Sequence, residues 1–299
     1  MGPDRSFFFI VNPRSGRGRG RGAVEAIEAE VDRHGVRATV TVSRTPADPA
    51  RLARRAAADG HVVVAAGGDG MVGMVADALA GSEAVMGIVA LGVGNDFASS
   101  LGLPVGDPAE ACRALWHGTP TRIDLGRVQW RGGTRHFCSV AGAGFDSEAA
   151  RWADTVAWLR GRTLYTVAAV RTLFSFSPLR FSLTCDDGAV AEYPGWLVAV
   201  GNSTSYGGGM KVAPRARVDD GLLDVTIVGP VGKVEFVRAF PRVFRGTHLS
   251  HPRVDSLRVS QVRIDADRAI DCYADGERCG PLPVDIQAVP GALTLLLPR

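Results

Sequence analysis

Short apolar runs alternate with helix-like segments along the N-terminal part of the chain. Strand-like runs are predicted at residues 7–11, 36–42, 61–66 and 86–91. Segments with helical spacing or composition are predicted at residues 22–34, 46–59 and 71–79. Strands that alternate with helices form parallel sheets with helices on both faces. The pattern therefore predicts an N-terminal α/β domain built on a parallel sheet.

The pattern changes near residue 123, where most of the runs become β-like. They lie at residues 123–130, 135–140, 179–185, 189–200, 222–228, 257–264, 269–273, 282–289 and 292–297. Turns rich in Gly, Pro and Asp join them, and one long helical stretch at about residues 146–176 interrupts them. This is typical of an antiparallel, mostly β fold. We therefore expect two domains, residues 1–125 and 126–290.

Length and composition agree with this division and exclude several classes of protein. A chain of 299 residues, 46% hydrophobic and 22% charged, is ordinary globular material of about two domains. No apolar run approaches the roughly 18–20 residues that span a bilayer. The apolar stretch at the start is too short for a signal peptide, and no small-residue cleavage site follows it. We expect a cytoplasmic protein.

Charge and cysteine content argue against three further features: nucleic-acid binding, a disulfide framework and a zinc site. The formal net charge is +3, and only Lys211 and Lys233 among the 34 basic residues are lysines. So small an excess does not favour a nucleic-acid-binding protein. The five cysteines form no CxxC pair, which indicates reduced thiols rather than a disulfide framework or a zinc site.

Three glycine-containing loops follow predicted strands of the N-terminal domain. The first consists of Asn12, Pro13, Arg14, Ser15 and Gly16 and continues as an Arg/Gly run. Glycines let backbone N–H groups approach a phosphate, and arginine supplies bidentate charge. The alternative is a flexible, solvated loop. The position of this loop after a strand favours phosphate binding.

The second and third loops each carry an aspartate among glycines. They are Gly67, Gly68, Asp69, Gly70 and then Gly92, Val93, Gly94, Asn95, Asp96. Asp69 and Asp96 can face a nucleotide or its metal ion, or simply cap the helices that follow. Neither loop is a Walker A or GxGxxG motif. Because ligands of α/β sheets bind at the carboxyl ends of strands, the three loops together predict a nucleotide site.

The motifs NPRSG, GGDG and GxGND, in this order, resemble the diacylglycerol kinase catalytic-domain family of lipid kinases. The resemblance continues at residues 124–126 (DLG), 143–146 (AGFD), 206–210 (YGGGM), 220–224 (DGLLD) and 275–277 (DGE). It implies an N-terminal nucleotide domain, a C-terminal β-sandwich domain and an active site in the cleft between them. It also implies that a final strand near residues 291–299 packs back on the first domain.

The resemblance implies that the three loops bind ATP with Mg²⁺, together with Thr45, which stands where the family often keeps a threonine. Two positions depart from the family pattern. Met71 and Val93 replace threonines whose hydroxyl groups would help to hold phosphates. Each lost neutral hydrogen bond costs about 0.5–1.5 kcal/mol, so nucleotide binding is expected to be weaker, with an altered pose, another donor or lost catalysis as further outcomes.

Two acidic motifs of the second domain carry the remaining chemistry. Asp275-Gly276 is by itself a hairpin turn signal, but that interpretation leaves Glu277 without a role. The family places its proposed base in this motif, which implies Glu277 as the base and Asp275 as its close partner. The resemblance also implies a structural Mg²⁺ held by the Asp220 carboxylate and the backbone carbonyls of Arg217 and Leu222.

Residues 151–180 combine five arginines with bulky apolar side chains such as Trp152 and Trp158. A helix of this kind can dock on an anionic membrane surface, or it can be an ordinary helix with a solvated arginine face. Either interpretation is compatible with the sequence. A peripheral contact with the inner membrane surface and a homodimer both stay open.

The function expected from these observations is an ATP-dependent lipid kinase that phosphorylates the hydroxyl group of diacylglycerol or a related lipid. Two alternatives remain. One is a non-catalytic homologue that binds a nucleotide or lipid, which Met71 and Val93 favour. The other is a kinase of a soluble alcohol, since NAD kinases share a GGDG loop. The sequence does not name the acceptor.

Overall fold

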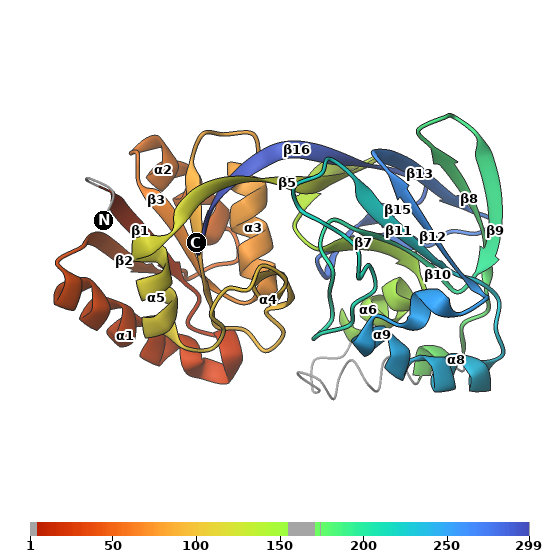
Figure 1. Cartoon of the computed structure of the whole chain (residues 1–299), viewed down its shortest axis with the longest axis horizontal. Coiled ribbons are helices and arrows are strands. Elements are labelled where there is room, and N and C mark those ends of the chain that lie inside the picture. The colour runs from red at the N-terminus through yellow and green to blue at the C-terminus, as the bar shows by residue number, and fades with distance from the viewer. Residues whose placement is uncertain (1–4, 155–170, 174, 299) are drawn as a thin grey trace. The chain divides into compact units, whose positions relative to one another are not determined.

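Two strands, β5 (Thr119–Trp130) and β16 (Val284–Leu297), belong in part to each of two units of the chain. The computed structural model describes residues 5–154, 171–173 and 175–298. The first unit comprises Met1–Leu125 with Pro290–Arg299, and the second comprises Gly126–Val289. Figure 1 shows both units, with most of their elements labelled.

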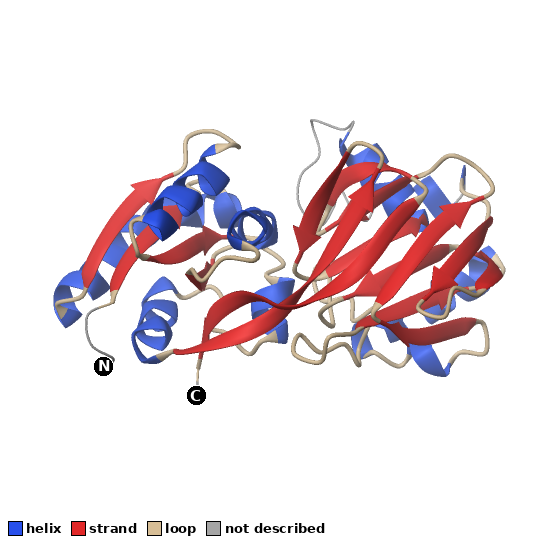
Figure 2. Ribbon diagram, turned by 90° about the horizontal axis from the view of Figure 1, so that it is seen from above, coloured by secondary structure: helices blue, strands red, loops and turns tan. Residues whose placement is uncertain are grey.

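The first unit has a parallel sheet in the order β2-β1-β3-β4, with α1 and α5 in contact with each other and α2 in contact with α3. Figure 2 shows helices on both faces of this sheet. The predicted α/β class is confirmed. Its elements are β1 (Ser6–Val11), α1 (Arg19–His34), β2 (Arg37–Val42), α2 (Asp48–Ala58), β3 (Val62–Gly67), α3 (Asp69–Leu79), β4 (Val85–Ala90), α4 (Asp96–Ser100) and α5 (Pro108–His117).

The core of this unit explains why its central strands have no polar positions. Every residue of β3 is buried, as expected for a strand that is covered on both faces. On the face of α1 and α5, the Trp116 ring packs edge-on against Phe7, with the ring centroids 4.8 Å apart. The last strand joins the same core, because β16 pairs in parallel with β4 and Leu296 is buried beside Trp116.

The second unit consists of antiparallel sheets around one core, which confirms the predicted β class. One sheet has the order β12-β11-β10-β7-β14-β15, and the other contains β9, β8, β13, β16, β5 and β6. Apolar residues of both sheets form a single cluster that includes Phe181, Val198 and Ile264. The strands are β6 (Gly133–Phe137), β7 (Val140–Gly144), β8 (Leu179–Cys185), β9 (Val190–Gly195), β10 (Leu197–Gly201), β11 (Leu223–Val228), β12 (Val254–Val259), β13 (Gln261–Ala266), β14 (Asp271–Ala274) and β15 (Glu277–Pro281).

Four of the predicted strand-like runs are divided or joined differently in the structure. The runs 189–200 and 257–264 each contain two strands, because the chain changes from one sheet to the other within them. At Gly195 a side chain would collide with the carbonyl of Val228, so the crossing needs glycine. Conversely, the runs 282–289 and 292–297 form one strand, since Gly291 bends it without ending it.

The helices of the second unit also differ from the prediction. A helix α6 (Phe145–Asp154) occupies the start of the predicted stretch 146–176, and residues 155–170 and 174 lie outside the described residues. Two helices, α8 (Lys233–Ala239) and α9 (Pro241–Arg245), were not predicted. No helix within the described ranges is both long enough and apolar enough to cross a membrane.

Candidate active site

The three glycine loops follow β1, β3 and β4, which are neighbours in the parallel sheet of the first unit. Parallel strands end at the same edge, so the loops lie together there (Figure 1). Thr45 lies in the turn between β2 and α2, and β2 is the edge strand of the same sheet, next to β1. The structure therefore brings the predicted nucleotide loops to one edge, where α/β sheets bind ligands.

The first loop is held by its own asparagine. The backbone N–H of Asn12 donates to the carbonyl of Ala66 at 2.9 Å, and the Asn12 side chain accepts the N–H of Arg14 at 3.0 Å. The chain then turns through Gly16, whose φ is 59°, into α1. A side chain at Gly20 would collide with the carbonyl oxygen of Asn12. The loop is thus packed directly on the first turn of α1.

The second and third loops contact each other backbone to backbone. A methyl group on Gly68 would lie 3.2 Å from the Cα of Gly92, and one on Gly92 would lie 2.6 Å from the Cα of Gly68. Asn95, with a positive φ of 55°, accepts the Gly92 N–H at 2.7 Å and donates to the Gly92 carbonyl at 3.0 Å. This contact explains why both loops need glycine and leaves the N-terminus of α3 next to the third loop.

Asp69 and Asp96 point toward the same spot above Gly94. A methyl group on Gly94 would lie 3.0 Å from Asp69 Oδ2 and 3.1 Å from Asp96 Oδ2. Burial, with a further contribution from the charge of Asp96, raises the pKa of Asp69 above its ordinary value. A divalent cation would relieve this repulsion, and carboxylate oxygens are ligands that Mg²⁺ prefers. The pair fits a cation that is shared with the phosphates of a nucleotide.

The two positions that depart from the family pattern differ in exposure. Met71 is buried, and its sulfur fills the space beside Gly67 where a side chain would otherwise lie. Val93 is 51% exposed in the third loop. Thr45 is also exposed, and its backbone N–H donates to Asp48 at 2.9 Å. Neither Met71 nor Val93 supplies the hydroxyl group that the family pattern has there.

A small hollow, which was not predicted from the sequence, lies near these loops in the first unit. Its volume is about 330 Å³. The lining residues are small or apolar: Gly22, Ala23, Ala26, Leu91, Gly106 and Pro108. Leu91 directly precedes the third loop, so the hollow adjoins the predicted phosphate site.

In the second unit, Asp275 and Glu277 lie in the hairpin of β14 and β15 and differ in hydrogen bonding and exposure. The Asp275 carboxylate accepts three backbone N–H groups, from Cys138 at 2.6 Å, Ser139 at 2.8 Å and Val140 at 3.2 Å. It therefore anchors the hairpin to the start of β7. Backbone N–H groups therefore already occupy the oxygens of this aspartate.

Glu277 has the accessible carboxylate of the pair. Its side chain is 56% exposed, and Arg135 Nη1 on β6 lies 4.0 Å from its Oε2. A carboxylate in this position can accept a proton from a hydroxyl group that approaches from solvent. The neighbouring guanidinium is a feature that the sequence analysis missed, because β6 is distant from the DGE motif along the chain.

The predicted structural Mg²⁺ site has competing partners. Asp220 Oδ1 accepts the N–H of Leu222 at 3.1 Å, and its Oδ2 forms an ion pair with Arg258. Arg258 also lies 3.7 Å from buried Asp224, whose pKa is raised by burial. The guanidinium of Arg217 is exposed and bonds to Asp219. A cation at Asp220 would have to displace the half-exposed Arg258 side chain.

The YGGGM motif forms a tight loop that was quoted in the sequence but given no role. The backbones of Tyr206 and Met210 exchange two hydrogen bonds, and the three glycines between them all have positive φ. The Tyr206 hydroxyl donates to Asp146 Oδ2 at 3.2 Å. Burial raises the pKa of Asp146. This pair joins the motif to the start of α6.

Only the ends of the predicted membrane-docking stretch 151–180 can be described. Arg151 forms an ion pair with Glu148 at 2.7 Å, and the Arg171 guanidinium lies 5.2 Å from the centre of the Trp152 ring. Arg160 and Arg162, which would carry the predicted charge, lie outside the described residues.

Comparison with known proteins defines the class to which these sites belong. Residues 6–128 match the family model described as the diacylglycerol kinase catalytic domain. Residues 139–297 match the YegS C-terminal NAD kinase beta sandwich-like domain. The chain belongs to the diacylglycerol kinase family, and the predicted resemblance is confirmed. Membership of a kinase family implies the use of ATP.

Individual relatives support the same assignment over nearly the whole chain. A protein of Mycobacterium tuberculosis H37Rv named diacylglycerol kinase is 36% identical over 97% of this chain and 94% of its own length. A Chromohalobacter salexigens protein named as a YegS-like lipid kinase is 32% identical over 87% and 84%. The fold matches a crystal structure of a Bacillus anthracis diacylglycerol kinase with a TM-score of 0.76 at 21% identity, covering 99% of this chain and 98% of that one. The prediction of a lipid-kinase enzyme is confirmed at this level.

Proposed function

We propose that this protein transfers the γ-phosphate of ATP to the hydroxyl group of diacylglycerol or a closely related lipid. The observation that carries the proposal is the meeting of three glycine loops at one sheet edge, with Asp69 and Asp96 directed at a common spot. The named relatives support the choice of a lipid acceptor.

The nucleotide is proposed to bind on the first unit. Backbone N–H groups of the loops and the N-terminus of α3 would hold its phosphates, because a helix N-terminus favours negative charge. The hollow beside Leu91 has a size and lining suited to an aromatic base. Asp69 and Asp96 would hold Mg²⁺, which neutralises charge on the transferred phosphoryl group when it is bound.

Glu277 is proposed to orient and deprotonate the acceptor hydroxyl group, and Asp275 to position it. Exposure makes Glu277 accessible to a substrate, whereas three N–H groups occupy Asp275. Arg135 Nη1, 4.0 Å from Glu277 Oε2, can hold the carboxylate in place. The chemical work of the chain is positioning and proton transfer.

Two finer points accompany this proposal. A Mg²⁺ ion at Asp220, with the carbonyls of Arg217 and Leu222, would replace the ion pair with Arg258 and stabilise the fold. Residues 151–180 would contact an anionic membrane surface in which the acceptor lies. Both rest on the sequence resemblance and on charge.

A non-catalytic homologue is the second candidate, and Val93 is the observation that favours it. A valine that is 51% exposed in a phosphate loop offers no hydrogen bond to a nucleotide. Such a protein would bind the nucleotide without turnover. A kinase of a soluble alcohol would instead turn over in the absence of micelles or vesicles.

The test is labelled ATP with a panel of lipid and soluble alcohols, applied to the wild type, Glu277→Gln and the exposed control Glu28→Gln. We expect transfer to diacylglycerol in micelles, a loss of about 10²–10⁴-fold in turnover for Glu277→Gln, and unchanged turnover for the control. Nucleotide binding, followed by the rise in melting temperature with Mg²⁺ and ATP, should survive in Glu277→Gln and be largely lost in Asp69→Ala. Wild-type protein that binds the nucleotide but phosphorylates no alcohol would contradict the proposal.

A further inference from the structure

The helices α8 and α9 combine exposed apolar side chains with exposed basic side chains. Neither helix has a buried residue. Val234 is 65% exposed, Val237 is 53% exposed and Phe244 is 41% exposed, so three of the seven large hydrophobic residues exposed in the described chain lie on this short segment. A cluster of exposed apolar side chains indicates a binding surface.

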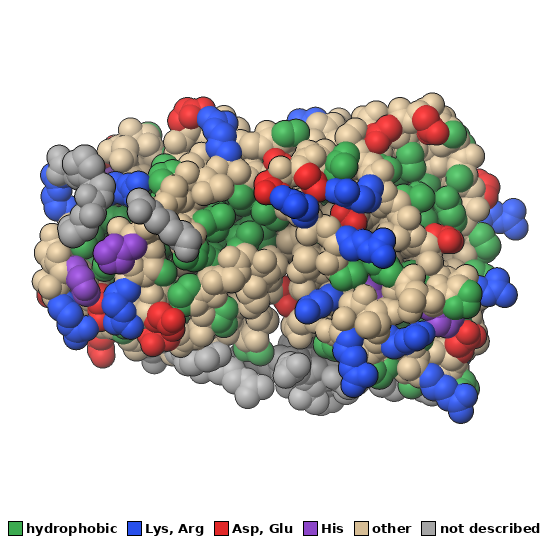
Figure 3. Space-filling model, viewed as in Figure 1, with side chains coloured by type: hydrophobic (Ala, Val, Ile, Leu, Met, Phe, Trp, Pro, Cys, Tyr) green, Lys and Arg blue, Asp and Glu red, His purple; other side chains and the backbone are tan. Residues whose placement is uncertain are grey.

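The same segment carries a concentration of positive charge. Lys233, Arg238, Arg242 and Arg245 are exposed, and Glu235 is the single acidic residue among them. Figure 3 shows Lys and Arg side chains gathered over the part of the second unit where Figure 1 draws α8 and α9. The charge is thus superimposed on the exposed apolar residues.

The arginines of this segment differ from most others in their surroundings. Within the described ranges, no carboxylate lies at ion-pair distance from the guanidinium groups of Arg238, Arg242 or Arg245. Arginines elsewhere have such partners, for example Arg122 with Glu83 at 2.8 Å and Arg263 with Asp285 at 2.8 Å. The one acid of the segment is engaged, because Glu235 lies 3.3 Å from His251. The surface is therefore complementary to a negatively charged partner.

The inner side of the segment fixes it to the core of the second unit. The Phe236 ring lies 4.9 Å from Trp196 and 5.1 Å from Phe145, measured between ring centres. Phe240 continues this row toward Phe244, with ring centres 5.8 Å apart for the last pair. Because these aromatic contacts hold the helices from below, Val234 and Val237 are not needed for packing.

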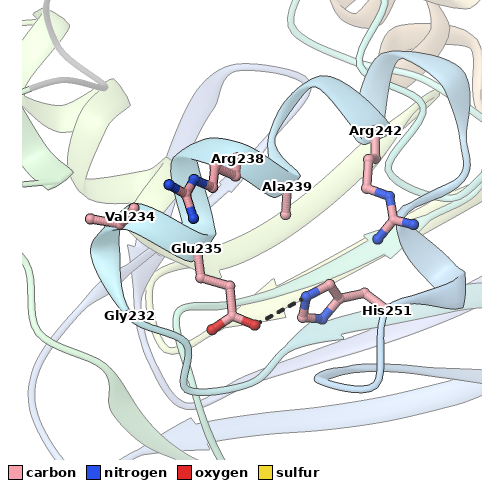
Figure 4. Close-up of a pocket in the computed structure, with 7 residues that line it drawn as sticks. All are labelled: Gly232, Val234, Glu235, Arg238, Ala239, Arg242 and His251. Carbon is pink, nitrogen blue, oxygen red and sulfur yellow. Dashed lines mark ion pairs between the residues drawn. The ribbon is translucent and has the colours of Figure 1, made fainter.

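An open hollow of about 630 Å³ lies against the two helices (Figure 4). Arg238 and Arg242 line it together with Glu235 and His251. In Figure 4 the Arg242 side chain extends from α9 toward His251. A phosphate group that entered the hollow would meet guanidinium donors beside apolar side chains.

We propose that α8 and α9 form a docking surface for the anionic lipid bilayer that holds the acceptor. The arginines would attract the acidic headgroups, and Val234, Val237 and Phe244 would enter the boundary with the acyl chains. A nucleic acid would use the charge but not the apolar residues. The proposal rests on the proposed function for the reason why a bilayer is the partner. It names a surface different from residues 151–180.

The test is flotation of the protein with vesicles of phosphatidylglycerol and phosphatidylcholine, and with neutral vesicles of phosphatidylcholine alone. We compare wild type with the charge variant Arg238→Gln/Arg242→Gln/Arg245→Gln and the apolar variant Val234→Ser/Val237→Ser/Phe244→Ser. The matched control Arg54→Gln/Arg55→Gln/Arg131→Gln removes three exposed arginines outside these helices. Thermal melting without lipid verifies that each variant is folded.

We expect wild type and control to bind anionic vesicles at low salt and to dissociate as salt rises. The charge variant should bind on the order of a hundredfold more weakly and depend less on salt, at about fivefold for each arginine removed. The apolar variant should bind more weakly at every salt concentration, with an unchanged salt dependence. Charge and apolar variants that bind like the wild type would overturn the proposal and leave residues 151–180 as the contact.

Two further outcomes distinguish this proposal from the proposed kinase function and from dimerisation. Flotation needs no turnover, so it gives an answer even if the protein phosphorylates no lipid. If it does, the charge variant should keep wild-type rates on a dispersed short-chain diacylglycerol and lose them on vesicles. A wild-type dimer in the absence of lipid that these substitutions dissociate would show that the surface binds a second copy instead, and would contradict a docking role.

Discussion

At the scale of single residues, the two carboxylates of the DGE turn differ in hydrogen bonding and in exposure. Asp275 is held in a left-handed conformation, with φ of 48°, and its carboxylate collects the N–H groups at the start of β7. Glu277, two residues later, faces solvent. The same functional group therefore has different surroundings at the two positions, because only the Asp275 oxygens accept backbone N–H groups.

Asp275→Asn should destabilise the fold, since an amide offers one acceptor oxygen where two are used and turns a donor toward a backbone N–H. Leaving such a group unsatisfied costs about 1–3 kcal/mol. The urea midpoint measures this loss. The control Asp271→Asn breaks an ion pair with Arg278 on the surface of the same hairpin and should cost less than about 1 kcal/mol. Equal midpoints for wild type and Asp275→Asn would show that the three hydrogen bonds do not stabilise the hairpin.

His248 should make stability depend on pH. Burial lowers its pKa, and the hydrogen bond that its Nε2 donates to the carbonyl of Val212 at 3.1 Å only partly offsets this effect. As pH falls through the ordinary value of about 6.5, the unfolded chain takes up a proton that folded His248 refuses. Stability present above that pH is therefore lost below it.

Urea unfolding at several pH values between neutral and mildly acidic checks this. His248→Gln should lose less stability than the wild type over this interval, by up to about 1.4 kcal/mol per pH unit. His117→Gln, at an exposed histidine, should follow the wild type. Parallel curves for wild type and His248→Gln would exclude a contribution from His248.

At the scale of elements, close backbone contacts rather than flexibility account for several glycines in and beside the predicted nucleotide loops. Gly68 and Gly92 bring the second loop against the third, and Gly20 brings α1 against the first. Gly22 lies two residues further along the same helix, and a methyl group added to it would have no atom within 4 Å. A close backbone contact therefore requires glycine at position 20, whereas no such contact requires it at position 22.

Gly20→Ala should therefore be costly, because the added methyl group collides with the backbone of Asn12 and the loop or the helix must move. Overpacking of this kind costs about 1–3 kcal/mol. Differential scanning fluorimetry should show a lower melting temperature and a smaller rise with Mg²⁺ and ATP. Gly22→Ala should keep or raise the melting temperature, since alanine favours a helix by about 1 kcal/mol. A Gly20→Ala protein as stable as Gly22→Ala would exclude the collision.

At the scale of the whole molecule, the last residues of the chain complete the first unit. The N–H of Gly291 donates to the buried Asp124 carboxylate at 2.8 Å, and Thr294 and Leu295 pair with β4. Leu293, Leu295 and Leu296 are buried there. The core of the nucleotide unit is thus assembled from both ends of the sequence.

Deletion of residues 290–299 should unfold the first unit although residues 1–125 remain. Burial of each leucine is worth about 1.5–3 kcal/mol, and the sum approaches the whole stability of an ordinary domain. Calorimetry should show a lost or lowered transition and no rise with Mg²⁺ and ATP. Removal of residues 298–299 alone, beyond the end of β16, should change little. A deletion of residues 290–299 that still responds to the nucleotide would contradict this assembly.

The sequence by itself determined the fold class, the family and the positions of the three glycine loops. Strand and helix periods are local properties of the chain, and the loops are contiguous motifs at strand ends, so neither needs long-range contacts to be recognised. The confirmed family resemblance rests on the same contiguous residues, such as Asp69 within GGDG.

Only the tertiary structure decided where the chain passes from one sheet to the other, at Gly195 and Ser260. It also decided that backbone N–H groups bind the Asp275 carboxylate and that Arg258 forms an ion pair with Asp220. It also decided that α8 and α9 expose basic and apolar side chains on one surface. Each of these depends on residues far apart in the sequence that meet only after folding. A local pattern carries no information about which distant carbonyl, amide or carboxylate will be its neighbour, and that choice determines what each side chain can do.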